Sequence, residues 1–390
     1  MPSQPTMSPM KTDPVLKTIC AAALLLLLAS LWMPAAEVDG KPLYWGQSGW
    51  ALAGLGGIAA AALMGLTGLV WRGAAARSSL AFAAAFAVLS LIGAAAPLLL
   101  LAQEVTVVPG SSGFWLVLAA MMLLACASLS KLAAVESALA WPQHAIPLVL
   151  GAWVILFWQI GVQAFEVPRV LLPAPAWIAQ TMWEQWDVLL DDFQITVLHS
   201  ALVGYVLGCA GGCLLGILID KSPFLQRGLL PVCALASSVP LVGIAPIMVM
   251  WFGFEWHSKA AVVALMTFFP MLVSTFAGLA ATGRMELDLM RSYAAGHTRT
   301  LFSLRLPTAL PFLFNGLKVA STLALIGAIV AEFFGSPTVG MGFRISSEAA
   351  RMNMGLVWAT IVVAALAGTL IYALISWAER RVTFWHPSQR

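Results

Sequence analysis

Charged side chains are scarce in this sequence of 390 residues: only 9% of its positions are Asp, Glu, Lys or Arg, whereas 61% are hydrophobic. An ordinary soluble domain carries about 25% charged residues. So small a charged fraction excludes a soluble fold of this size, because too few polar side chains remain to cover its surface. Lipid tails, in contrast, solvate apolar side chains. The chain is therefore predicted to be an all-α polytopic membrane protein.

The motifs of several enzyme classes are also missing. The one Gly-Lys pair, Gly40-Lys41, is followed by Pro42 and not by the Ser or Thr of a phosphate-binding loop. The five cysteines lie in apolar runs, which predicts buried thiols and no disulfide framework. No set of nucleophile, base and metal ligands is clustered in the sequence. We therefore expect no ATP site, no catalytic residue, no metal site and no cofactor bound by this chain.

About ten segments are long and apolar enough to cross a hydrocarbon core near 30 Å. Their approximate limits are 15–34, 49–71, 79–102, 113–130, 145–165, 196–219, 230–252, 259–281, 314–333 and 354–377. Most lysines and arginines fall on the side of the N-terminus, and the other side has only Lys41, Arg169, Lys259, Arg344 and Arg351. The positive-inside rule then places both termini in the cytoplasm. The first span, followed by Pro34-Ala35-Ala36, also fits a cleaved secretory signal, which would leave the remaining topology unchanged.

The composition changes near residue 140. Residues 1–140 contain about four Ala-, Leu- and Gly-rich spans with short loops, and residues 141–390 contain about six spans with longer polar connections. This pattern predicts an accessory N-terminal membrane domain followed by the functional domain. Within the second part, residues 174–190 have tryptophans at helical spacing and an acidic side, which predicts a helix lying in the outer membrane interface.

The longest loop on the inner side, 282–313, mixes apolar and basic residues in the pattern of a helix–turn–helix. It resembles the coupling loop of binding-protein-dependent ABC importer permeases, a Glu-Ala-Ala motif followed by Gly, Ile and Leu-Pro at fixed spacing. Aligning Leu306-Pro307 places Ala294 at the Gly position, with Gly296 two residues later; which of the two makes the turn is left open. The resemblance assigns contact with an ATPase subunit to Asp288, Tyr293, Ala294, Ala295, Gly296, His297, Arg299, Leu304, Leu306 and Pro307.

Other segments resemble the nitrate/taurine/aliphatic-sulfonate type of this family, over about 145–386. They are 171–175, 238–241, 245–246, 251–253, 316–320, 331–333, 339–342 and 379–385. The resemblance implies a type I ABC importer permease core with an N-terminal four-helix extension, in a bacterial inner membrane. It also implies a homodimer in lipid, cytoplasmic ATPase subunits that hold ATP and Mg, a periplasmic solute-binding protein and no nucleic acid. The implied solute is small and anionic, such as a sulfonate or nitrate, although similar permeases move heterocyclic vitamin precursors.

Polar residues in or beside the core spans are candidates for the solute path: Ser237, Ser238, Pro240, Thr267, Ser274, Asn315, Thr322 and Glu332. Hydrogen bonding between helices is the alternative role for the hydroxyl and amide groups. Glu332 is either a functional charge at membrane depth or a carboxylate already in water at the outer end of its span. A secondary transporter or channel is the alternative function, because such proteins also contain broken spans. Co-purification of an ATPase separates the two functions.

Overall fold

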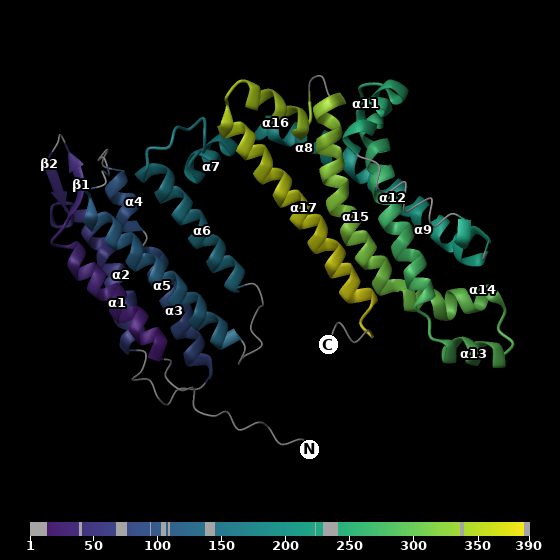
Figure 1. Cartoon of the computed structure of the whole chain (residues 1–390), viewed down its shortest axis with the longest axis horizontal. Helices are drawn as coiled ribbons and strands as arrows, with labels where there is room; N and C mark the ends of the chain where they lie inside the picture. Colours follow the sequence, from purple (N-terminus) through teal and green to yellow (C-terminus); the bar gives the residue numbers. More distant parts are fainter. Residues whose placement is uncertain are drawn as a thin grey trace, which may run out of the picture. The chain divides into compact units, whose positions relative to one another are not determined.

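The computed structural model describes residues 14–38, 41–67, 76–93, 95–102, 107, 110–136, 145–222, 224–228, 241–335 and 339–385. They belong to two compact units, Met1–Ala176 (unit 1) and Trp177–Arg390 (unit 2), which are coloured from purple to teal and from teal to yellow in Figure 1. The boundary near residue 140 between an accessory and a functional domain stays a prediction.

Unit 1 is a helical bundle with a small hairpin. Its helices are α1 (Pro14–Ser30), α2 (Gly49–Thr67), α3 (Ala76–Gly93), α4 (Ala95–Leu101), α5 (Ser112–Glu136) and α6 (Ala145–Ala164). α1 packs against α5 and α2, and α3 packs against α2 and α5. The core contains large apolar side chains that are almost fully buried, among them Trp45, Phe86, Phe114 and Trp153. The helices therefore hold together through buried apolar side chains.

The hairpin in unit 1 was not predicted from the sequence. β1 (Pro34–Val38) pairs with β2 (Lys41–Tyr44) in antiparallel register, and the short 3₁₀ helix η1 (Trp45–Gln47) follows. Ala35 and Ala36, which belong to the alternative cleavage site, are fully buried in the core of unit 1.

Unit 2 has a longer series of helices around α12 (Trp256–Ala280), which packs against α9 (Leu202–Lys221), α15 (Leu306–Gly335) and α11 (Leu241–Phe252). α17 (Met354–Val382) packs on α15. The short helices α13 (Arg284–Ser292) and α14 (His297–Thr300) lie at one end of this bundle. At the other end lie α7 (Pro175–Glu184), α8 (Trp186–Phe193) and α16 (Met341–Ala350) (Figure 1).

Two π-helical segments interrupt the regular helices of unit 2. η2 (Gln194–Ala201) joins α8 to α9, and η3 (Leu301–Arg305) joins α14 to α15. The single interfacial helix predicted over 174–190 is wrong in one respect: the chain breaks at Gln185, which has φ −110° and ψ 26°, and forms α7 and α8 instead. Residues 229–240, which include the first part of the span predicted over 230–252, lie outside the described part of the chain. Pro246 lies inside α11.

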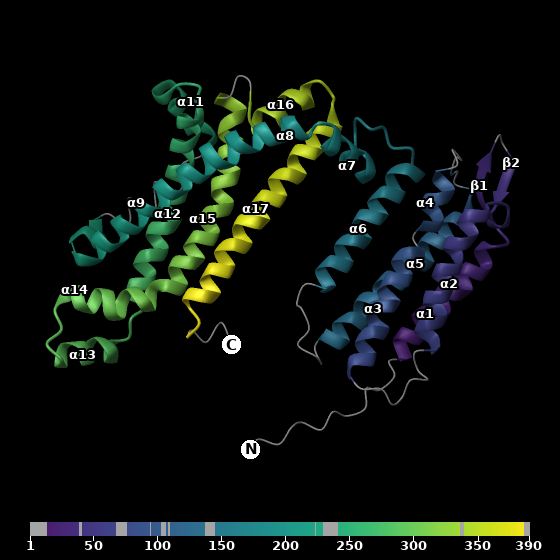
Figure 2. The same cartoon turned by 180° about the vertical axis from the view of Figure 1, so that it is seen from behind.

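α9 and α12 pack closely against each other (Figure 2). Four glycines at four-residue spacing, Gly204, Gly208, Gly212 and Gly216, form one stripe along α9. A Cβ atom on Gly204 would lie 2.5 Å from the Ala260 carbonyl oxygen, and one on Gly216 would lie 2.8 Å from the Thr275 Cβ atom. Small residues allow this close approach of membrane helices, so the stripe sets the distance between the two backbones.

The membrane-spanning character of the chain is confirmed. Within the described residues, seven helices are long and apolar enough to cross a bilayer. Three shorter apolar helices, Val15–Ser30, Ala51–Leu66 and Gly243–Phe252, coincide with the remaining predicted spans. Helices satisfy every backbone hydrogen bond within the segment, which a lipid-exposed span requires. The protein is thus an all-α polytopic membrane protein.

Candidate functional site

The predicted helix–turn–helix loop is formed by α13 and α14. α13 ends in a turn in which the Ala294 N–H donates to the Arg291 carbonyl at 2.8 Å, and the Ala295 N–H donates to the Met290 carbonyl at 3.0 Å. These two bonds are the Schellman pattern of a helix C-terminus. Ala294 has φ +51° and is therefore the turn residue, at the position where the coupling pattern has glycine.

Gly296 does not make this turn. It precedes α14 with φ −64° and ψ 165°, a conformation open to any residue, and a Cβ atom there would meet nothing within 4 Å. A β-branched residue at Gly296 is therefore not expected to distort the turn. The left-handed backbone lies at Ala294, where glycine relieves the steric penalty of a Cβ atom.

An apolar stripe is exposed on α13 and the turn that follows. Met285, Leu289 and Tyr293 recur every four residues, which places them on one helix face, and they are 81%, 57% and 78% exposed. The intervening residues include Arg284, Glu286 and other polar groups. Surface apolar residues gathered on one face mark an interaction site. Sequence reasoning singled out only Tyr293 from this stripe, although the four-residue spacing was visible.

The other residues predicted for the loop contact fall into two groups. Asp288, His297 and Arg299 are exposed, and Asp288 pairs with Arg291 at 3.0 Å with both side chains in water. A pair of this kind contributes little to stability. Leu304, Leu306 and Pro307 are half-buried around the start of α15, where they attach the loop to the body of unit 2.

The described residues among those predicted for the solute path differ in exposure. Asn315 and Thr322 are exposed and lie seven residues apart on one face of α15. Ser274 is half-buried against Gly316. Thr267 is fully buried between α12 and Gly208, and its hydroxyl donates to the Val263 carbonyl of its own helix at 2.9 Å. The remaining three, Ser237, Ser238 and Pro240, lie outside the described residues. Their role in the path stays a prediction.

Glu332 is part of a buried polar network at the end of unit 2 opposite the α13–α14 loop. Its side chain is 1% exposed, which excludes the alternative of a carboxylate already in water. The Thr196 hydroxyl donates to Glu332 Oε1 at 2.8 Å, and the Gly342 N–H donates to Glu332 Oε2 at 2.8 Å. The Met341 N–H in turn donates to Thr196 Oγ1 at 2.8 Å.

Asp192 completes this network from α8. Its carboxylate is fully buried and accepts from the Gly340 N–H at 2.8 Å and from Arg344 Nε at 2.7 Å. The first N–H groups of a helix have no partner within the helix, and carboxylates there also interact favourably with the helix dipole. Asp192, Thr196 and Glu332 therefore cap α16 from three different elements.

The two glycines before and in the first turn of α16 are explained by this cap. Gly340 has φ +128°, and a Cβ atom there would lie 2.7 Å from the Glu332 carboxylate. A Cβ atom on Gly342 would lie 2.8 Å from Glu332 Cβ. Any larger residue at either position would displace the N-terminus of α16 from the carboxylates of Asp192 and Glu332. No local sequence signal could identify Asp192, Thr196 or Arg344 as cap residues, because their partners are between 136 and 152 residues away.

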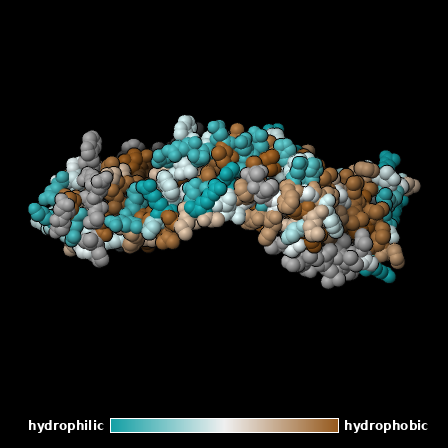
Figure 3. Space-filling view, turned by 90° about the horizontal axis from the view of Figure 1, so that it is seen from above, coloured by the Kyte–Doolittle hydropathy of each residue, from teal (hydrophilic) through white to brown (hydrophobic). Residues whose placement is uncertain are grey.

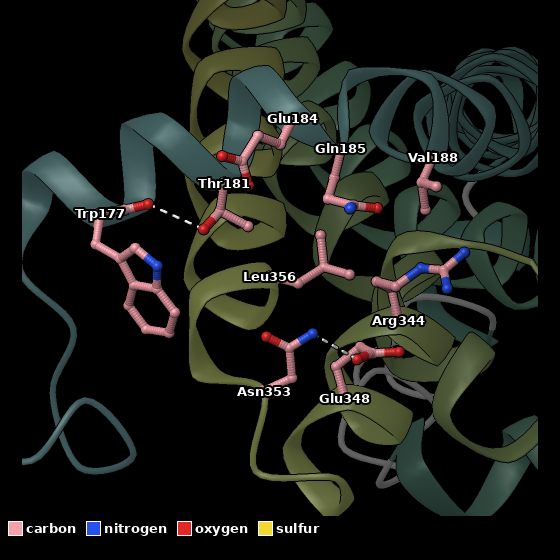
Figure 4. A pocket seen from close by; sticks show the side chains of 9 residues that line it. All are labelled: Trp177, Thr181, Glu184, Gln185, Val188, Arg344, Glu348, Asn353 and Leu356. Carbon is pink, nitrogen blue, oxygen red and sulfur yellow. Dashed lines mark hydrogen bonds between the residues drawn. The ribbon is translucent and has the colours of Figure 1, made fainter.

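A pocket of about 360 Å³ opens beside this network. Hydrophilic residues gather over the part of unit 2 where α8 and α16 lie (Figure 3). The pocket lining comes from α7, α8, α16, α17 and the turns that join them. It consists of Trp177, Thr181, Glu184, Gln185, Val188, Arg344, Glu348, Asn353 and Leu356 (Figure 4).

The charges of this pocket are partly matched already. Arg344 is paired with Asp192, and Glu348 accepts from Arg351 at 3.1 Å and from the Asn353 amide at 2.9 Å. The carboxylates of Glu184 and Glu348 make the pocket suited to hydrogen-bond donors and cationic groups. Among the described residues, no group of three His, Cys, Asp or Glu side chains is placed to hold a metal ion.

Comparison with known proteins covers most of unit 2. A family model described as "Binding-protein-dependent transport system inner membrane component" matches residues 204–384. The riboflavin transport system permease protein of Chloroflexus aurantiacus is 31% identical over 249 residues, 64% of this chain and 92% of that protein. The formylaminopyrimidine transport permease protein of Halalkalibacterium halodurans is 30% identical over 243 residues, 62% of this chain and 96% of that protein.

A third relative represents the subclass that the sequence resembles. The taurine transport system permease protein of Escherichia coli is 25% identical over 264 residues, 63% of this chain and 92% of that protein. All three relatives are covered over nearly their full length, and the matched family region includes the α13–α14 loop and the helices that carry it. The chain belongs to the family of binding-protein-dependent ABC importer permeases.

Proposed function

We propose that this chain is the membrane-spanning permease subunit of an ATP-driven importer, and that its α13–α14 loop docks on a separate ATPase subunit. The exposed apolar stripe Met285–Leu289–Tyr293 at one end of unit 2 carries this proposal. Two copies pair around a central path, and a periplasmic binding protein delivers the solute to the outer end. Closure of the ATPase moves the loops and alternates access to the path. The subunit itself is a transport component, and ATP hydrolysis takes place on its partner.

The solute class belongs to the same proposal. The relatives are named for riboflavin, formylaminopyrimidine and taurine, among others. We place small anions of the sulfonate or nitrate kind first, because several segments of the chain resemble permeases of that type, and heterocyclic compounds second. Thermal stabilisation of the binding protein encoded with this system, measured against taurine, nitrate and riboflavin, discriminates between the two classes; stabilisation by riboflavin alone would exclude the first.

Replacing both Leu289 and Tyr293 with aspartate is expected to abolish recovery of the ATPase subunit. Each apolar side chain contributes about 1.5–3 kcal/mol when it is fully buried, and 1.4 kcal/mol corresponds to a tenfold change in affinity. The double variant should therefore bind its ATPase at least 100-fold more weakly. Affinity purification of the tagged permease from detergent, followed by quantification of the ATPase, measures the loss.

The matched control is the double variant Leu289→Met and Tyr293→Phe, which keeps the apolar area and should retain the ATPase. Ala294→Gly is a second control: it relieves the left-handed backbone of the turn and should leave recovery unchanged. Equal recovery with the aspartate variant and the parent would remove the docking role of the stripe. A parent that never retains an ATPase would instead favour a transporter without an ATPase partner.

We also propose that both termini are cytoplasmic and that the loop lies on the same side. The distribution of lysine and arginine supports this orientation. A tag after Arg390 should resist modification by a membrane-impermeant reagent in intact cells, and a tag inserted after Glu166 should react. A C-terminal tag that reacts in intact cells would reverse the orientation and place the loop where no ATPase can reach it.

Residues 1–140 are proposed to be an accessory membrane domain outside the solute path. They lie outside the region that the family model matches, and their spans carry few polar residues. A chain that lacks them is expected to insert, to retain its ATPase and to transport the solute at close to the parent rate. Normal insertion and ATPase recovery combined with lost uptake would show that these residues belong to the mechanism.

A further inference from the structure

The inner end of α9 is tied to the coupling loop by a two-point ion pair. Arg305 donates from Nη1 to Asp220 Oδ2 at 2.6 Å and from Nη2 to Asp220 Oδ1 at 2.8 Å. Nη2 also donates to the Leu279 carbonyl at 3.0 Å, near the C-terminus of α12. The two side chains are 17% and 8% exposed, so salt and water screen this pair far less than a surface pair.

Stability alone does not account for such a pair. Removing two charges from water offsets much of their attraction, and apolar residues of similar volume often hold a buried contact equally well. Leu279, Leu301 and Ala309 form such an apolar contact in the adjoining core. The ion pair also fixes the orientation of the two side chains, because a planar guanidinium that binds a carboxylate at two points has one fixed geometry.

Arg305 is the last residue of η3, between the exposed helix α14 and the membrane helix α15. α14 has no buried residue, and Leu301, which is 7% exposed, begins the π-helical segment that ends at Arg305. π-helical segments are rare and occur frequently at functional sites. A displacement of α14 therefore reaches Asp220 through a single short segment.

In the described part of the chain, two other ion pairs have both side chains less than 20% exposed. Lys318–Glu379 joins α15 to α17, and Asp192–Arg344 joins α8 to α16. Neither contains a residue of the loop. Arg305–Asp220 differs because it links the loop to α9, a membrane helix that precedes the loop by more than 60 residues.

We propose that Arg305 and Asp220 are positioning residues that make α9 follow the coupling loop, so that ATPase closure moves α9 together with α15. The proposal rests on the proposed docking of the α13–α14 loop on an ATPase. Without the pair, the loop still docks and ATP is still hydrolysed, but the movement reaches only α12 and α15, the two helices that the loop joins. An ion pair that only stabilises the fold has a different consequence. Its loss lowers the amount of folded protein and leaves the movement of α9 in the folded molecules unchanged.

The test follows the inner end of α9 in the full complex with its ATPase, reconstituted in lipid vesicles. Spin labels at Leu218 on α9 and Leu374 on α17, both exposed, are introduced after the native cysteines have been replaced. The distance between the labels is measured without nucleotide and after trapping with ATP and orthovanadate. In the parent, trapping is expected to shift this distance.

Arg305→Lys keeps the charge and loses the two-point geometry, and Asp220→Asn keeps the shape and loses the charge. Each is expected to reduce the shift at least twofold, while ATPase recovery and ATP hydrolysis stay within twofold of the parent. The exchanged pair Asp220→Arg with Arg305→Asp should recover at least half of the shift. If Asp220→Asn does not fold, the shift measured with Arg305→Lys alone tests the proposal.

A full shift in Arg305→Lys would overturn the proposal, and so would a yield that falls while the shift in the folded fraction is retained. Failure of the underlying function gives a different result, because the parent itself would then retain no ATPase and show no shift on trapping.

Discussion

Replacing Asp192 with alanine is expected to lower the free energy of unfolding by about 3–5 kcal/mol, as for other buried ion pairs that lose one partner. The substitution leaves Arg344 Nε and the Gly340 N–H without their acceptor in the buried network. An unpaired buried donor carries the full cost of its desolvation. Denaturant unfolding of the purified protein in detergent, followed by circular dichroism, measures the change.

Asp191→Ala is the matched control, because it removes the same charge from the neighbouring position of α8, where the side chain is exposed. It should change the free energy of unfolding by no more than about 0.5 kcal/mol. Asp192→Asn retains the shape and should lie between the two. Similar stability of the Asp191 and Asp192 variants would mean that the buried carboxylate does not hold the start of α16.

Adding one methyl group at Gly212 is expected to separate α9 from α12. A Cβ atom there would overlap the Phe268 carbonyl oxygen and lie 3.0 Å from the Leu272 nitrogen. These are backbone atoms, so no side-chain rotation relieves the overlap, and overpacking of this kind costs about 1–3 kcal/mol. Gly212→Ala should therefore lower the melting temperature in detergent and reduce the yield of folded protein.

Gly211→Ala provides the control on the same helix turn. Its Cβ atom would lie 3.4 Å from Phe268 Cδ2, an ordinary contact. Alanine also stabilises a helix interior by about 0.5–1 kcal/mol relative to glycine, so this variant should be as stable as the parent or more stable. If both alanine variants melted at the parent temperature, α9 and α12 would not be in backbone contact in the membrane.

The spans and the α13–α14 loop could be predicted from sequence because their signals are local. Apolar length identifies a membrane helix, and the alternation of apolar and charged residues in 284–300 indicated two short helices. The break at Gln185 could not be predicted, because residues on both sides of it continue the same helical pattern. The β1–β2 hairpin was missed because Pro34–Val38 was interpreted as the end of the first span or a cleavage site.

The site residues also divide into those with a local sequence signal and those without one. The coupling pattern located the turn to within two residues, and only the backbone angle of Ala294 decided between Ala294 and Gly296. Glu332 stood out as a lone charge, but its partner Thr196 is 136 residues away. Arg305 and Asp220, 85 residues apart, appeared in the sequence as two ordinary charges on the inner side. Pairings between distant helices depend on tertiary packing, for which a single sequence contains no local signal.

The glycine stripe of α9 has a consequence for how the protein changes shape. Helices separated by a layer of side chains can tilt or slide, because rotamers rearrange at the contact. Backbones in direct contact have no such layer, and close-packed interiors yield little. α9 and α12 therefore cannot slide along each other between Gly204 and Gly216, and the last turn of α9, which contains Asp220, is the part that moves with the coupling loop. The conformational change of the transport cycle is therefore confined to the surrounding contacts. These include the two π-helical segments at which α9 and α15 begin.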